Sequence, residues 1–139
     1  MTVHGADWIN AIQGRVNTYN AIVTTGAKPV WTRRGTTSCS TQEIVWNQAA
    51  LAAGLCRYTT VSTSGSDGAH ATISFSSSKT YHLPGSPGNC GLFYTTLHEF
   101  GHSQGLEHTT VSSAVMWGTD NGVTAMQEDD ILGLKARYS

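Results

Sequence analysis

Apolar side chains recur at three- and four-residue steps near the start of the chain. The series comprises Trp8, Ile12, Val16, Tyr19 and Val23. Because this spacing is the period of one helical face, it predicts an amphipathic helix over residues 7–25. Gly26 and Pro29 follow at positions typical of the end of a helix.

A second helix is predicted over residues 41–53. Ser40 and Glu43 have the spacing of a capping box, and Gly54 stands where a helix can end. Most positions between them are apolar: Ile44, Val45, Trp46, Ala49, Ala50, Leu51 and Ala53. So few polar positions indicate that this helix is well buried.

The strands and loops are predicted from alternation and from Pro and Gly. In residues 71–76, two apolar residues alternate with Thr and Ser, which is the period of a half-buried strand. Residues 30–34 are a candidate short strand, and the Ser/Thr/Gly-rich residues 59–68 indicate a loop or an irregular strand. The Pro- and Gly-rich residues 77–91 predict a loop.

Two further helices are predicted, one beginning near Leu92 and one over residues 126–137. The second carries Ile131, Leu134 and Tyr138 on one side. A chain of 139 residues without internal repeats or a linker predicts one domain over residues 1–139.

Composition and charge narrow the classes of partner. Lys and Arg number 8 and Asp and Glu 9, so the net charge is −1, and neither nucleic acid nor an anionic membrane is an expected partner. No apolar stretch is long enough to span a bilayer, and residues 1–20 lack the pattern of a secretory leader. Abundant Ser and Thr with little Lys suit a secreted protein, whose leader or pro-segment would lie outside this sequence.

Three cysteines allow one disulfide and leave one thiol over. Cys39 and Cys56 flank the predicted second helix, so we expect a bridge between them in an oxidising compartment, although spacing alone does not decide the pairing. Cys90 is predicted to be a structural or free thiol.

The densest chemistry lies in residues 98–108, which read His-Glu-Phe-Gly-His-Ser-Gln-Gly-Leu-Glu-His. His98 and His102 are four residues apart, so on a helix both face the same way and can bind one metal ion. Glu99 lies about 100° further round the helix, where its carboxylate can reach a metal-bound water without being a ligand.

His108 lies six residues beyond His102 and can be a third ligand only if the helix ends and the chain turns back. Gly105 lies between them, and glycine takes the left-handed conformation that such a reversal needs. Three imidazoles leave the fourth position of a tetrahedral zinc open for water. The motif therefore predicts one catalytic zinc on the three histidines, with Glu99 as the general base that activates water against a peptide carbonyl.

The same stretch matches His-Glu-x-x-His-x-x-Gly-x-x-His, the signature of the metzincin metallopeptidases, whose second mark is a tight turn with a Met beneath the zinc. Met116 follows His108 by eight residues, a spacing that resembles the matrixin, or matrix metalloproteinase-like, branch. Residues 91–93 (Gly-Leu-Phe) and 128–134 (Glu-Asp-Asp-Ile-Leu-Gly-Leu) are also similar to matrixins. The resemblance implies an α+β, zincin-like fold with a small twisted mixed sheet, backing helices, a zinc helix, a Met-turn and a C-terminal helix.

The resemblance also implies roles for residues around the metal. Met116 would support the zinc site from below without ligating it. One of Asp129 and Asp130 would accept hydrogen bonds from the Met-turn, and the other would meet the mature N-terminal ammonium. A core methionine and a solvated helix start are the simpler interpretations of these residues.

The wall of the S1′ pocket would run from Val115 through Trp117 and Gly118 to about Val123, which implies an apolar residue after the scissile bond. Gly118 stands where other metzincin branches place a Tyr as an additional zinc ligand. Its presence favours a four-coordinate, matrixin-like zinc.

One region departs from the family. Matrixins carry a long segment before the zinc helix, with an edge strand that pairs with substrate, a second zinc and calcium sites. Here that region is compressed into residues 76–90, and the usual Leu-Ala-His-Ala strand is absent. Asp67, His70 and His82 are candidate remnants of a second metal site, with exposed loop residues as the simpler interpretation. The need for a second zinc or calcium therefore stays open.

The sequence thus predicts a secreted, monomeric zinc metalloendopeptidase that acts on proteins or peptides. One alternative is a non-catalytic zinc-containing peptide-binding module, suggested by the missing substrate strand. Glu99 weighs against it, since a binding module needs no general base. The other alternative is a zinc hydrolase of small amides or cell-wall peptides, which a truncated cleft would suit.

Overall fold

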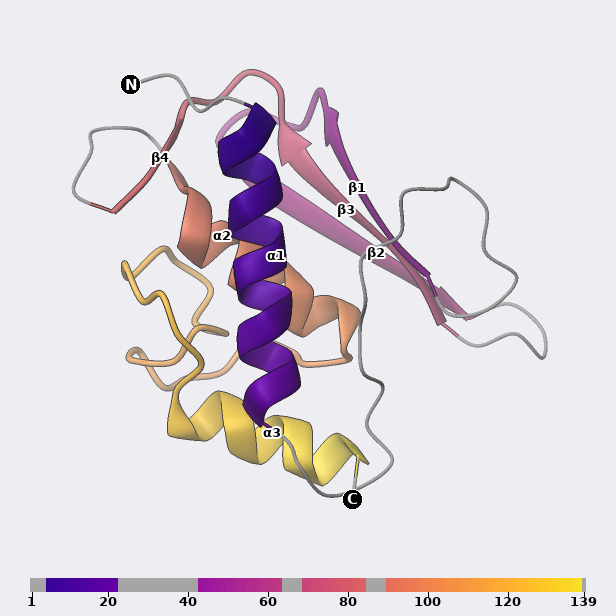
Figure 1. The fold of residues 1–139 in the computed structure, drawn as a ribbon, viewed down its shortest axis with the longest axis vertical. Helices are drawn as coiled ribbons and strands as arrows, with labels where there is room; N and C mark the ends of the chain where they lie inside the picture. The colour runs from indigo at the N-terminus through magenta and orange to yellow at the C-terminus, as the bar shows by residue number, and fades with distance from the viewer. Residues whose placement is uncertain (1–4, 23–42, 64–68, 85–89, 139) are drawn as a thin grey trace.

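The computed structural model describes residues 5–22, 43–63, 69–84 and 90–138, drawn in colour in Figure 1. The elements are α1 (Gly5–Ile22), β1 (Glu43–Ala49), β2 (Arg57–Thr63), β3 (Ala69–Ser76), β4 (Tyr81–His82), β5 (Cys90–Gly91), α2 (Leu92–Ser103) and α3 (Glu128–Tyr138). Figure 1 shows α1 crossing in front of α2, with the three long strands to one side and α3 beneath. The mixed sheet and three helices agree with the predicted α+β, metzincin-like fold.

The main sheet has the strand order β1-β3-β2. β1 runs parallel to β3, whereas β2 runs antiparallel to it and forms an edge that packs against α2. β3 buries Ile73 and Phe75 toward the helices, as the alternating pattern of residues 71–76 predicted. A second, two-stranded sheet pairs β4 with β5 in parallel, just before α2 begins.

The prediction of a helix over residues 41–53 is wrong, because residues 43–49 form β1. Ile44 and Trp46 pack against the core while Val45, between them, is 43% exposed, which is the alternation of a strand. β1 pairs with β3 along its whole length, and this pairing outweighs the helical preference of the alanines and of the capping-box pattern. Gly54, with φ of 92°, lies in the turn toward β2 rather than at a helix end.

The other predicted elements have mixed outcomes. The helices predicted at residues 7–25, from Leu92 and at 126–137 are confirmed where the structure describes them. Residues 59–63, predicted as a loop or an irregular strand, complete the regular strand β2, and the predicted loop 77–91 contains β4 and β5. The predicted strand at 30–34 and the helix end at Gly26 and Pro29 lie outside the described residues.

The core consists of two clusters that meet at Trp46. One lies between α1, α2, α3 and the loop before α3: Val16, Tyr19, Leu97, Phe100, Leu106, Val115, Met116, Met126 and Leu134. The other lies between α1, β3 and the start of α2: Ala11, Ile73, Phe75, Tyr81, Cys90 and Leu92. The ring of Trp46 stacks on Phe75 at 5.9 Å and on Phe100 at 6.2 Å between centroids, so it joins the two clusters. The side chains of these two clusters therefore pack against α2 and fix its position.

A disulfide joins Cys56 to Cys90, with the two Cα atoms 6.0 Å apart. The expected bridge between Cys39 and Cys56 is therefore wrong, and Cys39 lies outside the described residues. Cys56 directly precedes β2 and Cys90 lies two residues before α2, so the bridge ties the edge strand to the zinc-motif helix. Sequence spacing did not suggest this pair because 34 residues separate the two cysteines.

We expect the variant Cys56→Ser/Cys90→Ser to lose about 2–4 kcal/mol of unfolding free energy, because the bridge restricts the unfolded chain. Chemical denaturation of the metal-free protein would measure the loss. The matched control is Cys39→Ser, which keeps the Cys56–Cys90 bridge and should retain most of the stability. Equal unfolding free energies for the wild type and the double variant would contradict a structural role for the bridge.

Candidate metal centre

α2 places His98 and His102 on one face and then ends abruptly. Leu97 and Phe100 are buried against α1 and its neighbours, which turns the opposite face of the helix toward β2. The helix stops at Gln104, and Gly105 takes a φ of 85°. The N–H of Gly105 donates to the carbonyl of His102 at 2.9 Å, and that of Leu106 donates to Gly101 at 3.1 Å. This pair of hydrogen bonds is the Schellman motif, which reverses the chain after a helix.

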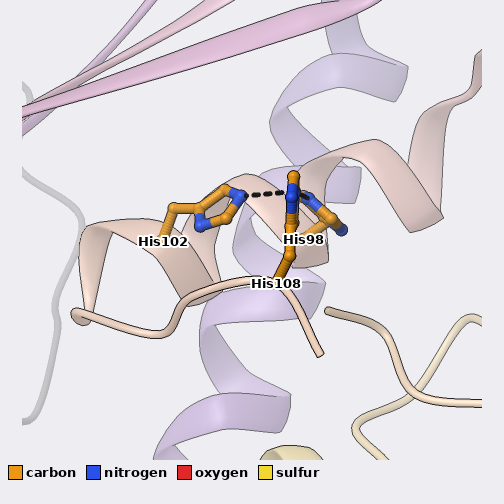
Figure 2. Close-up of side chains that lie close together, drawn as sticks. All are labelled: His98, His102 and His108. Atoms are coloured by element: carbon orange, nitrogen blue, oxygen red, sulfur yellow. Dashed lines mark hydrogen bonds between the residues drawn. The ribbon is translucent and has the colours of Figure 1, made fainter. Parts of the chain in front are cut away.

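The reversal returns His108 to the two helical histidines, as Figure 2 shows. Its Nε2 lies 3.2 Å from Nε2 of His98 and 3.2 Å from Nε2 of His102. In a tetrahedral zinc site with bonds of about 2.0–2.1 Å, neighbouring nitrogens are about 3.3–3.4 Å apart. Two of the three distances thus match the edges of a zinc tetrahedron, and the three ligand atoms all lie within 4.8 Å of one another. No other group of three possible ligands gathers among the described residues.

Backbone carbonyls set the orientation of two of the rings. Nδ1 of His98 donates to the carbonyl of Val115 at 2.7 Å, and Nδ1 of His102 donates to that of Leu106 at 2.7 Å. With the proton on Nδ1, each ring leaves the lone pair of Nε2 free for a metal ion. Burial, with a smaller contribution from the charge of Arg57, lowers the pKa of His98 to about 3, and burial also lowers that of His108. Both rings are therefore neutral near pH 7, the state that binds metal.

The carboxylate of Glu99 lies beside this cluster, and its side chain is only 4% exposed. Its Oε1 is 3.9 Å from Nε2 of His98 and 2.7 Å from Nε of Arg57. Its Oε2 accepts a hydrogen bond from the hydroxyl of Thr59. Arg57 and Thr59 come from β2, so the edge strand supplies both partners of the carboxylate.

The segment after His108 forms a tight turn beneath the helix. The N–H of Thr109 donates to the carbonyl of Met116 at 3.1 Å, which closes the turn. Met116 is 2% exposed, and a Cβ placed on Gly101 would lie 2.4 Å from its sulfur. The Met side chain therefore packs directly under the turn of α2 that lies between the two helical histidines.

Asp130 holds this turn in place from α3. Its Oδ2 accepts from the N–H of Val115 at 2.9 Å, and its Oδ1 accepts from that of Met116 at 3.0 Å. Oδ2 also accepts from the N–H of Gln127 at 2.8 Å, which caps the first turn of α3. Asp129 is half-exposed, and the N-terminal residues that it was expected to meet lie outside the described residues.

The comparisons with known proteins agree with this geometry. A sequence profile of the matrixin family matches residues 51–139, which include β2, β3, the three histidines, the Met-turn and α3. The chain belongs to the matrixin family. That match bears out the resemblance read from the sequence.

Two curated proteins are similar to part of this matrixin chain in sequence. The hatching enzyme of Paracentrotus lividus is 39% identical over 67 residues, which cover 46% of this chain and 11% of that protein. A protein of Spodoptera frugiperda ascovirus 1a named "Putative matrix metalloproteinase" is 36% identical over 52 residues, or 33% of this chain and 14% of that protein. The chain thus matches only a small part of the length of either relative.

The segment expected to line the S1′ pocket is tied to the zinc-motif helix of this matrixin. The hydroxyl of Tyr94 donates to the carbonyls of Trp117 and Thr119. Val115 is fully buried in the core, whereas Trp117 is half-exposed and Gly118 is exposed. Gly118 lies against the ring of His108, since a Cβ placed on it would be 3.6 Å from Nδ1.

His70 and His82, two of the three candidates for a second metal site, are not members of the histidine cluster of this matrixin. His70 stands on β3 and His82 on β4, so both are in strands rather than in the expected loops. Asp67 lies outside the described residues. Within the described ranges, His98, His102 and His108 form the only group of three His, Cys, Asp or Glu residues close enough to share an ion.

Sequence reasoning missed Arg57, Thr59, Tyr94 and Gly101. Arg57 follows the predicted helix over residues 41–53, and Thr59 lies in the segment 59–68 that was predicted as a loop or an irregular strand. No regular strand face was therefore expected there. The first three are ordinary residues whose roles depend on elements distant in sequence. A glycine inside a helix is unfavourable and can mark a packing contact, but Gly101 was not distinguishable in this way from Gly14, which lies in α1 with nothing near it.

We expect Gly101→Ala to destabilise the metal-free protein by about 1–3 kcal/mol, because the added methyl group meets the buried sulfur of Met116. Gly14→Ala is the matched control. It is also inside a helix, and nothing lies within 4 Å of the added Cβ, so it should stabilise by about 0.5–1 kcal/mol. Thermal unfolding measures both, and the same sign for the two variants would refute close packing of Met116 on α2.

We expect Asp130→Asn to cost about 2–3 kcal/mol, because its amide nitrogen would face an N–H donor where the carboxylate now accepts. Glu128→Gln, at an exposed position in the same helical turn, should change the unfolding free energy by less than about 1 kcal/mol. Urea denaturation of the metal-free proteins measures both. A loss no larger than that of Glu128→Gln would show that Asp130 does not hold the turn.

Proposed function

We propose that this chain is a zinc-dependent metalloendopeptidase that hydrolyses peptide bonds in proteins. The observation that carries the proposal is the cluster of three Nε2 atoms, two pairs of them 3.2 Å apart, beside the buried carboxylate of Glu99. The matrixin match and the two relatives support a peptidase. Because the chain covers so little of those relatives, their names alone do not establish the activity.

The donor set fits one zinc ion. His98, His102 and His108 would hold it through Nε2, and the carbonyls of Val115 and Leu106 would keep two of the rings in place. When bound, zinc supplies Lewis acidity and lowers the pKa of a bound water to about 7.

Glu99 is the proposed general base and acid. Its carboxylate oxygen lies 3.9 Å from Nε2 of His98, and Glu99 is not a member of the histidine cluster. From there it can take a proton from the attacking water and return it to the amine that leaves. Met116 and Asp130 contribute indirectly, because they hold the turn whose Val115 carbonyl orients His98.

The edge of β2 is the proposed binding site for an extended substrate. Within the described residues β2 pairs only with β3, so its other edge presents free backbone donors and acceptors next to α2. A peptide that adds as a further strand there would pass the zinc site. The Leu-Ala-His-Ala segment of matrixins is absent from this chain, and residues 57–63 supply an edge strand of different sequence for the proposed pairing. An edge strand in this place supports the catalytic function over the non-catalytic alternative.

We also propose the compartment, the domain organisation and the oligomeric state in which the protein acts. The Cys56–Cys90 disulfide supports work outside the reducing cytosol. None of the described helices is long and apolar enough to cross a membrane. We propose a single catalytic domain over residues 1–139 that acts as a monomer.

The decisive test compares Glu99→Gln with the wild type on a denatured protein substrate. We expect kcat/KM to fall by about 10²–10⁴-fold while one zinc stays bound per chain, because the variant lacks the base and keeps the ligands. Glu107→Gln, an exposed glutamate of the same motif, should retain activity. A chelator should abolish wild-type cleavage, and added zinc should restore it.

Other results would select the alternatives. Full activity of Glu99→Gln would remove the role given to that residue. A wild type that binds one zinc and cleaves no member of a varied peptide library would favour the binding module. Cleavage confined to small amides or cell-wall peptides would favour the third function.

A further inference from the structure

Arg57 and Thr59 form what we call the β2 clamp, because both reach from the edge strand to the carboxylate of Glu99. Nε of Arg57 lies 2.7 Å from Oε1, and the hydroxyl of Thr59 donates to Oε2. The two residues are two positions apart on β2, so their side chains share the face that packs on α2. Each carboxylate oxygen therefore has its own partner.

Burial makes this contact energetically significant. The side chains of Arg57 and Glu99 are 12% and 4% exposed, so neither charge is well hydrated. A buried carboxylate requires a charged partner or several hydrogen bonds, and removing one partner leaves an uncompensated charge. The clamp supplies both kinds of contact to Glu99.

The guanidinium of Arg57 is also fixed by contacts with residues other than Glu99. Its Cζ lies 4.7 Å from the centre of the Tyr94 ring, on the helix turn just before Glu99. The hydroxyl of the same Tyr94 bonds to the carbonyls of Trp117 and Thr119. Cys56, which directly precedes Arg57, is bonded to Cys90 at the start of the helix. The clamp is thus anchored to α2 through a ring contact and a disulfide.

We propose that Arg57 and Thr59 are positioning residues that fix the orientation of the Glu99 carboxylate at the histidine cluster. The proposal rests on the proposed function, in which that carboxylate moves a proton. Both oxygens are held, so the side chain cannot turn away, and each oxygen keeps a second lone pair that can accept a proton. Because the clamp is part of β2, the strand proposed to bind the substrate also aligns the general base.

The kinetic test uses Arg57→Gln, Arg57→Lys and Thr59→Val in the zinc-loaded protein. We expect Arg57→Gln to lower kcat by about 10–100-fold, the usual effect of losing an outer-shell partner, with KM changed less than about threefold. Thr59→Val should lower kcat by about fivefold, the equivalent of one hydrogen bond. Arg57→Lys should recover part of the loss, since it keeps the charge without the fixed Nε–H.

Thr72→Val is the matched control, because Thr72 is half-exposed on the central strand β3, on the face of the sheet opposite to the buried Ile73. It should have wild-type kinetics. Bound zinc should stay at one per chain in all variants, which separates the orientation of the carboxylate from loss of the metal. Wild-type kcat in both Arg57→Gln and Thr59→Val would overturn the proposal.

A second measurement needs neither zinc nor activity. Thermal unfolding of the metal-free wild type, Arg57→Gln, Glu99→Gln and the double variant forms a double-mutant cycle. We expect the two single substitutions to be non-additive, because each removes the same ion pair. Additive shifts of the unfolding midpoint would show that the pair is not coupled and would overturn the clamp.

The two proposals can fail separately. A wild type that cleaves no peptide would end the peptidase proposal, and the cycle alone would then decide whether the clamp fixes the carboxylate. If the wild type is active, additive shifts of the unfolding midpoint together with unchanged kcat in the clamp variants would overturn only the proposal for Arg57 and Thr59.

Discussion

The reversal of the chain at Gly105 is the constraint on which the metal centre depends. A helix alone can bring together only His98 and His102, and a continued helix would carry His108 away from them. A positive φ at Gly105 and the paired hydrogen bonds of the helix end turn the chain back, so that His108 completes the cluster. The same reversal places the carbonyl of Leu106 against Nδ1 of His102. One backbone conformation thus supplies a ligand and orients another.

The reversed chain is stabilised by a few buried polar contacts around one apolar core. Asp130 accepts three backbone N–H groups, two from the turn at Met116 and one from the start of α3. Met116 fills the space left by the absent side chain of Gly101. The carbonyl of Val115, held by this arrangement, orients His98. The carboxylate of Asp130 and the thioether of Met116 therefore help to connect the third helix to the metal centre.

On the opposite side, the sheet reaches the site through β2. Antiparallel pairing with β3 brings Arg57 and Thr59 over α2, and the Cys56–Cys90 disulfide ties the two elements together next to that contact. The result is a compact arrangement in which the strand edge, the proposed base and the three histidines are neighbours. A small matrixin domain can in this way form its site from a three-stranded sheet.

The sequence by itself determined the parts of the site that lie close together along the chain. The four-residue spacing of His98 and His102 encodes a shared helical face, and Gly105 encodes the reversal, because both depend on local backbone geometry. The amphipathic period of α1 and the alternation in β3 were also readable, since each depends on one periodic face. The resemblance to matrixins added the role of Met116 beneath the zinc site. It also limited the acceptor of hydrogen bonds from the Met-turn to Asp129 or Asp130.

The tertiary structure decided everything that depends on partners distant in sequence. Residues 43–49 form a strand because they pair with β3 along their whole length, although their apolar residues and the capping-box spacing suit a helix. Cys56 bonded to Cys90 rather than to Cys39 because the sheet and α2 bring their Cα atoms within 6.0 Å. Asp130 rather than Asp129 faces the Met-turn, and Arg57 meets Glu99 from 42 positions away in the sequence, for the same reason. Hydrophobic period and motif spacing report only local geometry, whereas these contacts exist only once the sheet has packed against the helix.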